Sequence, residues 1–264
     1  MNLRSFVYRV ARKVGFDSRI SFGLFSLLDV TRWFSCDFSE FMDQRGSDNL
    51  FRLGDTKPCF DDRMDQGGTM NGAYFHQDLL VARLIHAANP RVHVDIGSRT
   101  DGFVAHVASF REVELIDIRP IKSDVRNIKF RQADLMNLLE GFKSSTDSIS
   151  SLHAIEHFGL GRYGDPIDYW GYLKALDNIY EMLQPGGTFY FSVPIGPQRI
   201  EFNAHRVFSV RYLLDLLSQK YILVSMSIIN DAGNLFEDVD ISEEQITVNY
   251  GCHYGCGVFV LSKK

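Results

Sequence analysis

From residue 92 to the C-terminus, short runs rich in β-branched and aromatic residues alternate with segments of helical pattern. Parallel neighbouring strands need a crossover connection, usually a helix, so this alternation predicts a mostly parallel sheet covered on both faces. The chain is thereby restricted to the α/β class. The predicted strands are Val92–Ile96, Val113–Ile118, Ile128–Gln132, Ser148–His153, Thr188–Val193, Tyr221–Ile229 and Gly257–Leu261.

The segments before and between these strands predict the helices. Only the polar loop Asp231–Gly251 separates the last two strands, and adjacent strands without a crossover helix are expected to run antiparallel. The expected sheet is therefore mostly parallel, with its last strand antiparallel. The predicted helices are Gly72–Ala88, Gly102–Ser109, a segment near Leu135–Glu140, Tyr169–Leu183 and Ser209–Lys220.

The N-terminal part of the chain has a different pattern. Residues 1–70 predict an irregular, partly helical extension, in which Ser21–Phe41 is rich in aromatic residues and Asp43–Gly68 is a polar loop. Met1–Gly15 predicts a basic amphipathic helix that packs on its own domain or on a second copy in a homo-oligomer, with peripheral membrane association as the alternative. We therefore expect an extension over 1–70 and an α/β domain over 71–264.

Composition excludes several classes of protein. A net charge of −5 and a pI of about 5.9 give no basic surface for nucleic acid as the main partner. No run approaches the ~18–20 apolar residues of a membrane span, so no integral membrane segment is expected. The four cysteines are few and unevenly spaced, which favours reduced thiols in a cytoplasmic protein over a disulfide framework or a metal site.

Acidic residues follow the first three predicted strands. The first strand runs into Asp95-Ile96-Gly97-Ser98-Arg99, and Gly97 permits a tight turn near a ligand. Asp117 ends the second strand about 20 positions later, where a carboxylate can accept hydrogen bonds from ribose hydroxyls. Asp134 follows the third strand. Each Asp alone could cap a helix or turn, but the set together predicts a nucleoside site.

Two later loops supply titratable side chains at the same edge of the sheet. The fourth strand runs into His153, Glu156 and His157, and histidine is the side chain best suited to proton transfer near neutral pH. The fifth strand leads to His205 and Arg206, which suit an anionic or sugar-like acceptor, with a helix-capping network as the alternative.

The stretch from about Phe75 to Phe208 resembles a bacterial family, domain of unknown function 268, with a methyltransferase-like fold. The matching segments are Tyr74–Asp78, His93–Arg99, Ser148–Pro166, Tyr190–Gly196 and Phe202–Phe208. More distantly, Leu152–His157 and Leu183–Gly187 are similar to the L-x-x-x-E-H and L-x-P-G-G segments of S-adenosylmethionine-dependent methyltransferases. The resemblance implies a Rossmann-like class I methyltransferase fold with S-adenosylmethionine as cofactor.

The resemblance also implies roles for individual residues. Asp95 and Gly97 would bracket the methionine portion of the cofactor, with Ser98 and Arg99 in the same turn, and Arg99 could pair with the cofactor carboxylate. The first turn departs from the family pattern because Ser98-Arg99-Thr100-Asp101 replaces small, glycine-rich residues. The other cofactor-binding candidates are Asp117 and Ile118 at the ribose, Asp134 and Leu135 at the adenine, and Ser151 near the sulfonium.

The resemblance further implies O-methylation of a sugar or sugar-phosphate in bacterial surface polysaccharide biosynthesis as the reaction. His157 or His205 is the expected base, followed by His153 and His76, with Glu156 in the catalytic set. The candidates for binding the small-molecule or glycan acceptor are His76, Arg162, Tyr163, Asn203 and Arg206.

Two other functions stay open at this point. A metal-dependent sugar-modifying variant could gather a divalent ion at Asp165, Asp168 or His153, although the leading hypothesis involves no metal. A non-catalytic module could keep the fold and bind a nucleotide or a partner protein, which the unusual Ser98–Asp101 turn would favour.

Overall fold

The computed structural model describes residues 24–60, 62–137 and 141–264. The chain divides into two compact units, one ending at Thr69 and the other running from Met70 to Lys264. The basic helix expected over Met1–Gly15 lies outside the described residues. No helix in the described ranges is long and apolar enough to cross a membrane.

The first unit contains a helix of 22 residues, α2 (Leu24–Arg45), and a short 3-10 turn, η1 (Asp62–Met64). Aromatic contacts connect the two segments. The Phe60 ring lies 5.9 Å from Trp33 and 5.5 Å from Phe34, between ring centroids. Arg63 lies over the Trp33 ring and forms an ion pair with Asp37 at 3.1 Å. The aromatic residues that disturb helical periodicity thus fasten the following loop to the helix.

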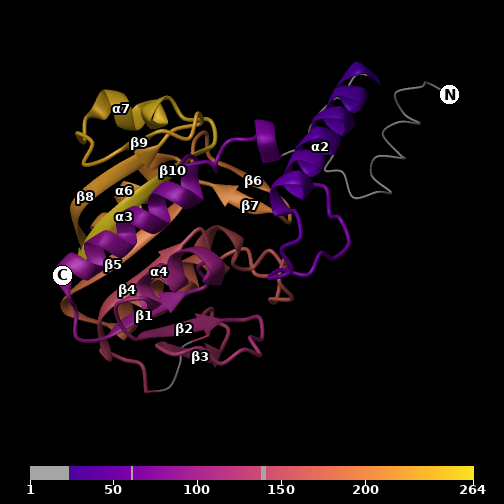
Figure 1. Ribbon diagram of the computed structural model, residues 1–264. Helices are drawn as coiled ribbons and strands as arrows, with labels where there is room; N and C mark the ends of the chain where they lie inside the picture. Colours follow the sequence, from indigo (N-terminus) through magenta and orange to yellow (C-terminus); the bar gives the residue numbers. More distant parts are fainter. Residues whose placement is uncertain (1–23, 61, 138–140) are drawn as a thin grey trace. The chain divides into compact units, whose positions relative to one another are not determined.

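The second unit is built on an eight-stranded sheet with the order β3-β2-β1-β4-β5-β10-β8-β9 (Figure 1). The pairs from β3 to β5 are parallel, whereas β10 runs antiparallel to both β5 and β8. The prediction of a parallel sheet with an antiparallel last strand is confirmed. The strands are β1 (His93–Ile96), β2 (Val113–Asp117), β3 (Ile128–Gln132), β4 (Thr146–Leu152), β5 (Leu183–Ile195), β8 (Tyr221–Ile229), β9 (Leu235–Phe236) and β10 (Gly255–Lys263).

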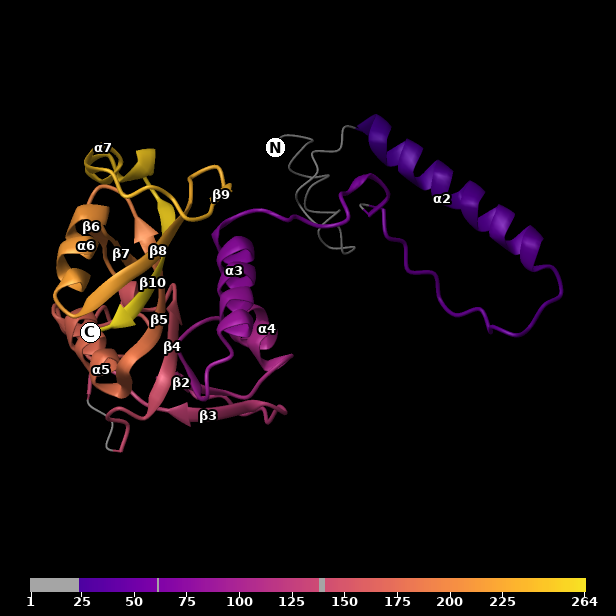
Figure 2. The same ribbon diagram turned by 90° about the vertical axis from the view of Figure 1, so that its left-hand side faces the viewer.

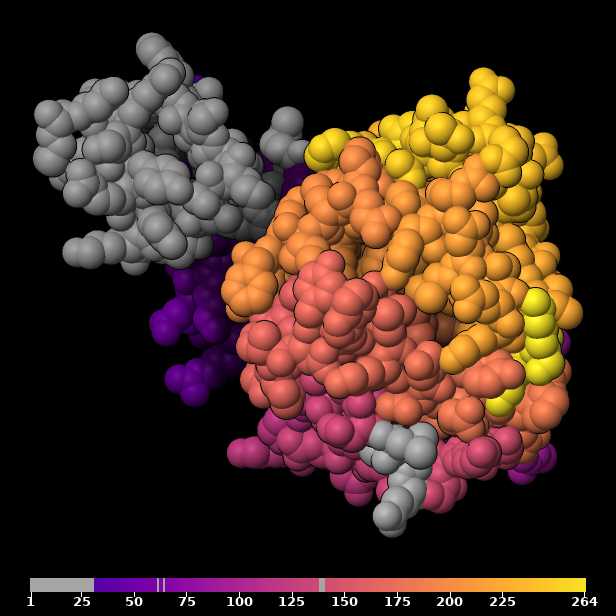
Figure 3. Space-filling view, turned by 180° about the vertical axis from the view of Figure 1, so that it is seen from behind, coloured from indigo at the N-terminus to yellow at the C-terminus, as the bar shows by residue number. Residues whose placement is uncertain are grey.

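Helices cover both faces of this sheet (Figure 2). On one face, α3 (Ala73–Ala88) and α4 (Ala105–Ala108) bury Val81, Ile85 and Val107 in one apolar cluster. On the other, α5 (Gly171–Met182) and α6 (Val210–Ser218) contribute to a second, larger cluster. Figure 3 shows this second side, where residues of α5 and α6 form much of the surface. The sheet is therefore the centre of a three-layer unit, which leaves strand ends as the place for a site.

Local differences from the predicted elements cluster in polar segments. The helix expected near Leu135–Glu140 is a turn over its described part, 135–137, because the Asp134 carboxylate accepts the Met136 N–H and ends regular structure there. The loop Glu201–Arg206 belongs to a hairpin of β6 (Arg199–Glu201) and β7 (His205–Val207). The loop before β10 contains α7 (Glu243–Thr247) and η4 (Asn249–Gly251). The predicted helix Gly102–Ser109 begins as a π-helical turn, η2 (Thr100–Val104).

Candidate functional site

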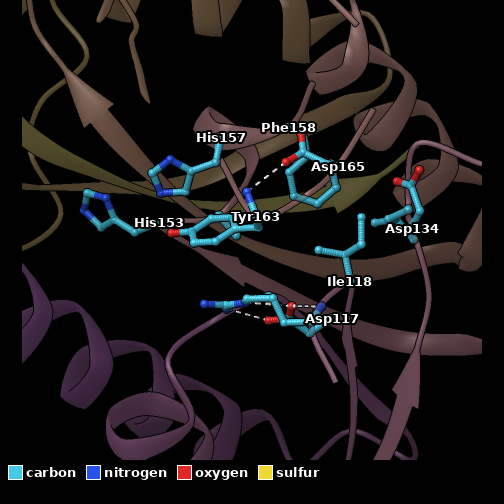
Figure 4. Close-up of a pocket in the computed structure, with 12 residues that line it drawn as sticks. Asp117, Ile118, Asp134, His153, His157, Phe158, Tyr163 and Asp165 are labelled. Carbon is cyan, nitrogen blue, oxygen red and sulfur yellow. Dashed lines mark hydrogen bonds and ion pairs between the residues drawn. The ribbon is translucent and has the colours of Figure 1, made fainter. Parts of the chain in front are cut away.

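A pocket opens at the carboxyl ends of β1, β2, β3 and β4 and encloses about 480 Å³ of space, part of it open to solvent. Figure 4 shows Asp117, Ile118 and Asp134 on one side of it and His153 and His157 on the other, with the Tyr163 ring between them. The complete lining is Gly97, Asp117, Ile118, Arg119, Asp134, Leu135, His153, Ala154, His157, Phe158, Tyr163 and Asp165. Residues from distant parts of the sequence thus meet where the topology predicts a ligand site.

The first turn is held by a buried hydrogen-bond network. Gly97 has φ +68°, which favours glycine, and a Cβ there would lie in tight contact with the Ala154 Cβ, at 3.1 Å. The Asp95 carboxylate accepts hydrogen bonds from the backbone and hydroxyl of Ser98 and from the Ser150 hydroxyl, at 3.1, 2.6 and 2.6 Å. Burial raises the pKa of Asp95 to about 6, and these donors lower it. Asp95 therefore stabilises the turn through these buried hydrogen bonds, and it does not line the pocket.

Asp117 ends β2 as predicted, but a cation already contacts it. Arg119 donates from Nε to Oδ1 at 3.0 Å and from Nη2 to Oδ2 at 2.6 Å, and its backbone N–H also donates to Oδ1. The Arg119 guanidinium in turn lies 4.4 Å from the centre of the Tyr163 ring. A carboxylate offers about four lone-pair positions, so Oδ2 keeps one free acceptor position for a hydroxyl.

Asp134 and its neighbours form the flatter side of the pocket. Both Asp134 oxygens accept local hydrogen bonds, from the Met136 N–H and the Asn137 amide, so its visible role is to hold a turn. Ile118, Leu135 and Phe158 line the same pocket with apolar side chains. Apolar groups with a few convergent polar ones are the usual composition of a small-molecule site.

At the opposite side, Glu156 lies between two histidines. Its Oε1 is 2.9 Å from His153 Nδ1 and 3.7 Å from His157 Nε2, and it is only 1% exposed. Burial alone lowers the pKa of His153, but the Cys256 sulfur and Glu156 outweigh it and raise that pKa well above its ordinary value. For Glu156, burial acts to raise the pKa, but the hydrogen bond and charge of His153 outweigh burial, so the pKa lies below its ordinary value. We therefore describe the pair as imidazolium and carboxylate.

His157 is in a different state. Burial lowers its pKa, so the ring is neutral at neutral pH. Its Nδ1 lies 2.6 Å from the Ala204 carbonyl oxygen and must donate to it, which leaves the lone pair on Nε2. A neutral histidine of fixed tautomer in a pocket wall is well suited to accept a proton.

The loop after β4 is fixed by Asp165 and Arg206. The Asp165 carboxylate accepts the N–H groups of Gly159, Gly161 and Tyr163. Arg206, only 4% exposed, donates to the carbonyls of Phe158 and Tyr169, at 2.7 and 3.1 Å. These contacts hold the wall of the pocket that carries His157.

Several predicted residues lie outside the pocket lining. Ser151 is buried and donates to the Ile96 carbonyl. His205 lies at the hairpin, with Nε2 3.1 Å from Glu201. Arg99 forms an ion pair with Asp101 at 3.0 Å. The remaining positions are half-buried His76 on α3, exposed Asn203 in the hairpin turn, and exposed Arg162, which donates to the Ala204 carbonyl.

The residues considered for a metal ion are occupied with local hydrogen bonds. Asp168 accepts the Trp170 N–H and pairs with Lys174. Within 24–60, 62–137 and 141–264, no group of three or more His, Cys, Asp or Glu side chains could hold a metal ion.

Sequence analysis did not select Arg119, Tyr74 or Tyr254. Arg119 could have been found because it follows Asp117 by two residues, a spacing that allows a local bidentate pair. Tyr74, whose ring lies 5.2 Å from that of His153, and Tyr254, 5.0 Å from that of His205, gave no local signal because tertiary packing creates these contacts.

Solved structures of methyltransferase-fold proteins share this architecture. The Burkholderia thailandensis 1,6-didemethyltoxoflavin-N1-methyltransferase, solved with S-adenosylhomocysteine, has a TM-score of 0.52 and 17% identity, covering 94% of this chain and 93% of that one. The (4+2)-cyclase SpnF has a TM-score of 0.50 and 13% identity, covering 72% and 84%. A TehB-like S-adenosylmethionine-dependent methyltransferase from Corynebacterium glutamicum has a TM-score of 0.47 and 21% identity, covering 69% of this chain and 86% of that one. At these identities the likeness to the first two structures, with TM-scores of 0.52 and 0.50, shows the Rossmann-like methyltransferase fold.

No curated protein shows significant sequence similarity to this chain. A family model does: residues 102–252, more than half of the chain, match the family described as "Caenorhabditis protein of unknown function, DUF268". The segments Tyr74–Asp78 and His93–Arg99 precede the matched range, and the family's description supports no bacterial source. The chain belongs to the DUF268 family.

Proposed function

We propose that this protein is an S-adenosylmethionine-dependent methyltransferase. The observation that carries the proposal is the pocket itself, which joins the Gly97 turn and the buried Asp117 carboxylate to a neutral His157 on the opposite wall. The cofactor supplies a methyl group on a cationic sulfur. The chain's task is then to bind it, orient an acceptor and accept a proton.

The residues fit the cofactor in three respects. Ile118, Leu135 and Phe158 offer apolar contacts for an adenine ring. The free acceptor position on Asp117 Oδ2 suits a ribose hydroxyl. The Gly97 turn has a positive φ and carries no side chain, so its backbone can approach a ligand closely. The fold-level neighbour with bound S-adenosylhomocysteine supports the same assignment.

We assign the base to His157. Its pKa is lowered, its tautomer is fixed by the Ala204 carbonyl, and its Nε2 carries the lone pair. Once Nε2 accepts a proton, the Glu156 carboxylate 3.7 Å away stabilises the cation. His153 and Glu156 hold this wall as a charged pair.

The proposed acceptor is a sugar or sugar-phosphate hydroxyl, in surface polysaccharide biosynthesis. The resemblance implies that setting, and the tyrosines give the acceptor class its physical support. Tyr74 and Tyr254 are both partly exposed close to the site histidines, and aromatic faces with polar rims suit sugar rings. Exposed Arg162 can pair with a phosphate. Four free cysteines fit the expected cytoplasmic location.

The test of cofactor binding is calorimetry with S-adenosylhomocysteine. We expect the wild-type protein to bind and Asp117→Ala to lose at least ten-fold in affinity, because a charged hydrogen bond contributes about 1.5–3 kcal/mol. Asp124→Ala is the matched control, since Asp124 is an exposed acid in the same β2–β3 connection. Absence of binding by the wild-type protein would refute the proposal.

A non-catalytic nucleotide-binding module is the second candidate. The first turn favours it, because Ser98-Arg99-Thr100-Asp101 replaces the small, glycine-rich residues of methyltransferases and Arg99 is paired with Asp101 there. S-adenosylhomocysteine binding without transfer of labelled methyl to any member of a sugar and sugar-phosphate panel would favour this module over the enzyme.

A further inference from the structure

A buried carboxylate lies beside the pocket without an evident structural task. Asp78 is on the buried face of α3 and is only 5% exposed. Its Oδ1 accepts a hydrogen bond from the Gln77 amide at 3.1 Å. Burial raises the pKa of Asp78 to about 6, and the Gln77 amide and the nearby His106, Arg99 and His153 side chains lower it.

The second carboxylate oxygen of Asp78, Oδ2, faces the first turn. A Cβ on Gly102 would lie 2.4 Å from Asp78 Oδ2, so only a glycine allows this carboxylate to approach the backbone there. The N-cap residue of the η2 turn, Arg99, makes no side-chain capping hydrogen bond. The carboxylate thus lies at the end of the turn that Gly97 begins.

A cation lies on the same turn. The Arg99 guanidinium is 4.9 Å from the centre of the Tyr74 ring, and that ring is 5.2 Å from the ring of His153, which lines the pocket. Arg99 is half exposed, and its present partner is the exposed Asp101. One negative side chain, Asp78, and one positive side chain, Arg99, therefore lie at the first turn, near the side of the pocket that His153 lines.

Resting on the proposed function, we propose that Asp78 and Arg99 hold the two charges of the cofactor's amino-acid end. Asp78 accepts hydrogen bonds from the α-ammonium group, and Arg99 exchanges Asp101 for the α-carboxylate. The opposite signs match a zwitterion, and Arg99 lines a hollow at the first turn together with the ribose candidate Asp117. Arg99, which departs from the glycine-rich pattern of the first turn, then binds the cofactor's α-carboxylate.

Three ligands separate the two contacts by calorimetry. S-adenosylmethionine carries both charges, decarboxylated S-adenosylmethionine lacks the carboxylate, and 5′-methylthioadenosine lacks the whole amino-acid chain. We expect Asp78→Asn to weaken the binding of S-adenosylmethionine and of its decarboxylated form about 10- to 100-fold, and that of 5′-methylthioadenosine less than two-fold. Arg99→Gln should weaken S-adenosylmethionine alone.

The controls distinguish recognition from folding. Asp78→Asn removes a buried charge, so its melting temperature should not fall below that of the wild-type protein. Asp177→Asn, an exposed acid on α5 paired with Lys220, should leave all three affinities unchanged. If Asp78→Asn leaves S-adenosylmethionine binding unchanged, or weakens 5′-methylthioadenosine equally, the inference is wrong while the proposed function stands. If the wild-type protein binds no nucleoside ligand, both fail.

Discussion

Replacing Asp95 by asparagine should make the stability of the protein less dependent on pH. The Asp95 carboxyl is fully buried below the first turn, and burial raises its pKa from 3.8 to about 6. At 1.36 kcal/mol per pKa unit, this rise corresponds to about 3 kcal/mol. Asparagine has nearly the same shape, can still accept the Ser98 N–H, and carries no titratable group.

The sign follows from which state loses its proton first. As the pH rises from 3.8 to 6, the unfolded chain ionises at this position while the folded protein keeps the proton. The contribution of Asp95 to stability is therefore complete below pH 3.8 and is lost as the pH rises through 6. The free energy of unfolding of Asp95→Asn, minus that of the wild type, should increase by about 2 kcal/mol between pH 4.5 and pH 7.

Urea denaturation of both proteins at several pH values measures this difference directly. Other buried groups, including His93, titrate equally in both proteins and cancel. Any constant cost of the altered hydrogen bonds cancels too, because only the change with pH is compared. Ser150→Ala removes a donor that lowers the pKa of Asp95. In a protein that keeps Asp95, this substitution should therefore extend the pH-dependent loss of stability to higher pH. A difference that stays constant to within about 0.5 kcal/mol would refute the account of the turn.

Three further outcomes test the site. Gly97→Ala should lower the free energy of unfolding by about 1–2 kcal/mol, because its φ of +68° is strained for other residues, as urea denaturation would show. Arg119→Gln should lower the free energy of unfolding by about 1–3 kcal/mol, because it leaves the buried Asp117 short of partners. S-adenosylhomocysteine should then raise the melting temperature of the variant more than that of the wild type, and an equal rise would contradict this. His157→Gln should reduce kcat/KM about 10²–10⁴-fold with unchanged S-adenosylhomocysteine affinity, and the wild-type rate should fall with decreasing pH through a pKa below 6.5; a profile without that decline would argue against His157 as the base.

The fold was predictable because its strands carry their own signal. Ile128–Gln132 and Tyr221–Ile229 were predicted with their observed bounds. The first alternates apolar and polar residues, and the second is a run rich in apolar residues, and both patterns are typical of strands. The β6–β7 hairpin was missed because polar residues dominate it and pairing alone defines it. Short polar strands give no periodic pattern to recognise.

The candidate site was predictable only in part. The positions of Asp117 and His157 follow from strand ends, which topology brings together. The partners of those side chains do not follow from it. No local rule shows that Arg119 lies on Tyr163, or that Asp78 approaches Gly102 from a helix 24 positions earlier, because side-chain directions and packing decide these contacts.

The buried Arg206 guanidinium has a consequence for the energetics of ligand binding. By holding the carbonyls of Phe158 and Tyr169, it orders the loop that carries His157 as part of folding. The conformational entropy of that loop is therefore lost when the chain folds and not when a ligand arrives. A preorganised wall of this kind binds small polar ligands without a large ordering cost, so the heat capacity change on binding should be small for the size of the ligand.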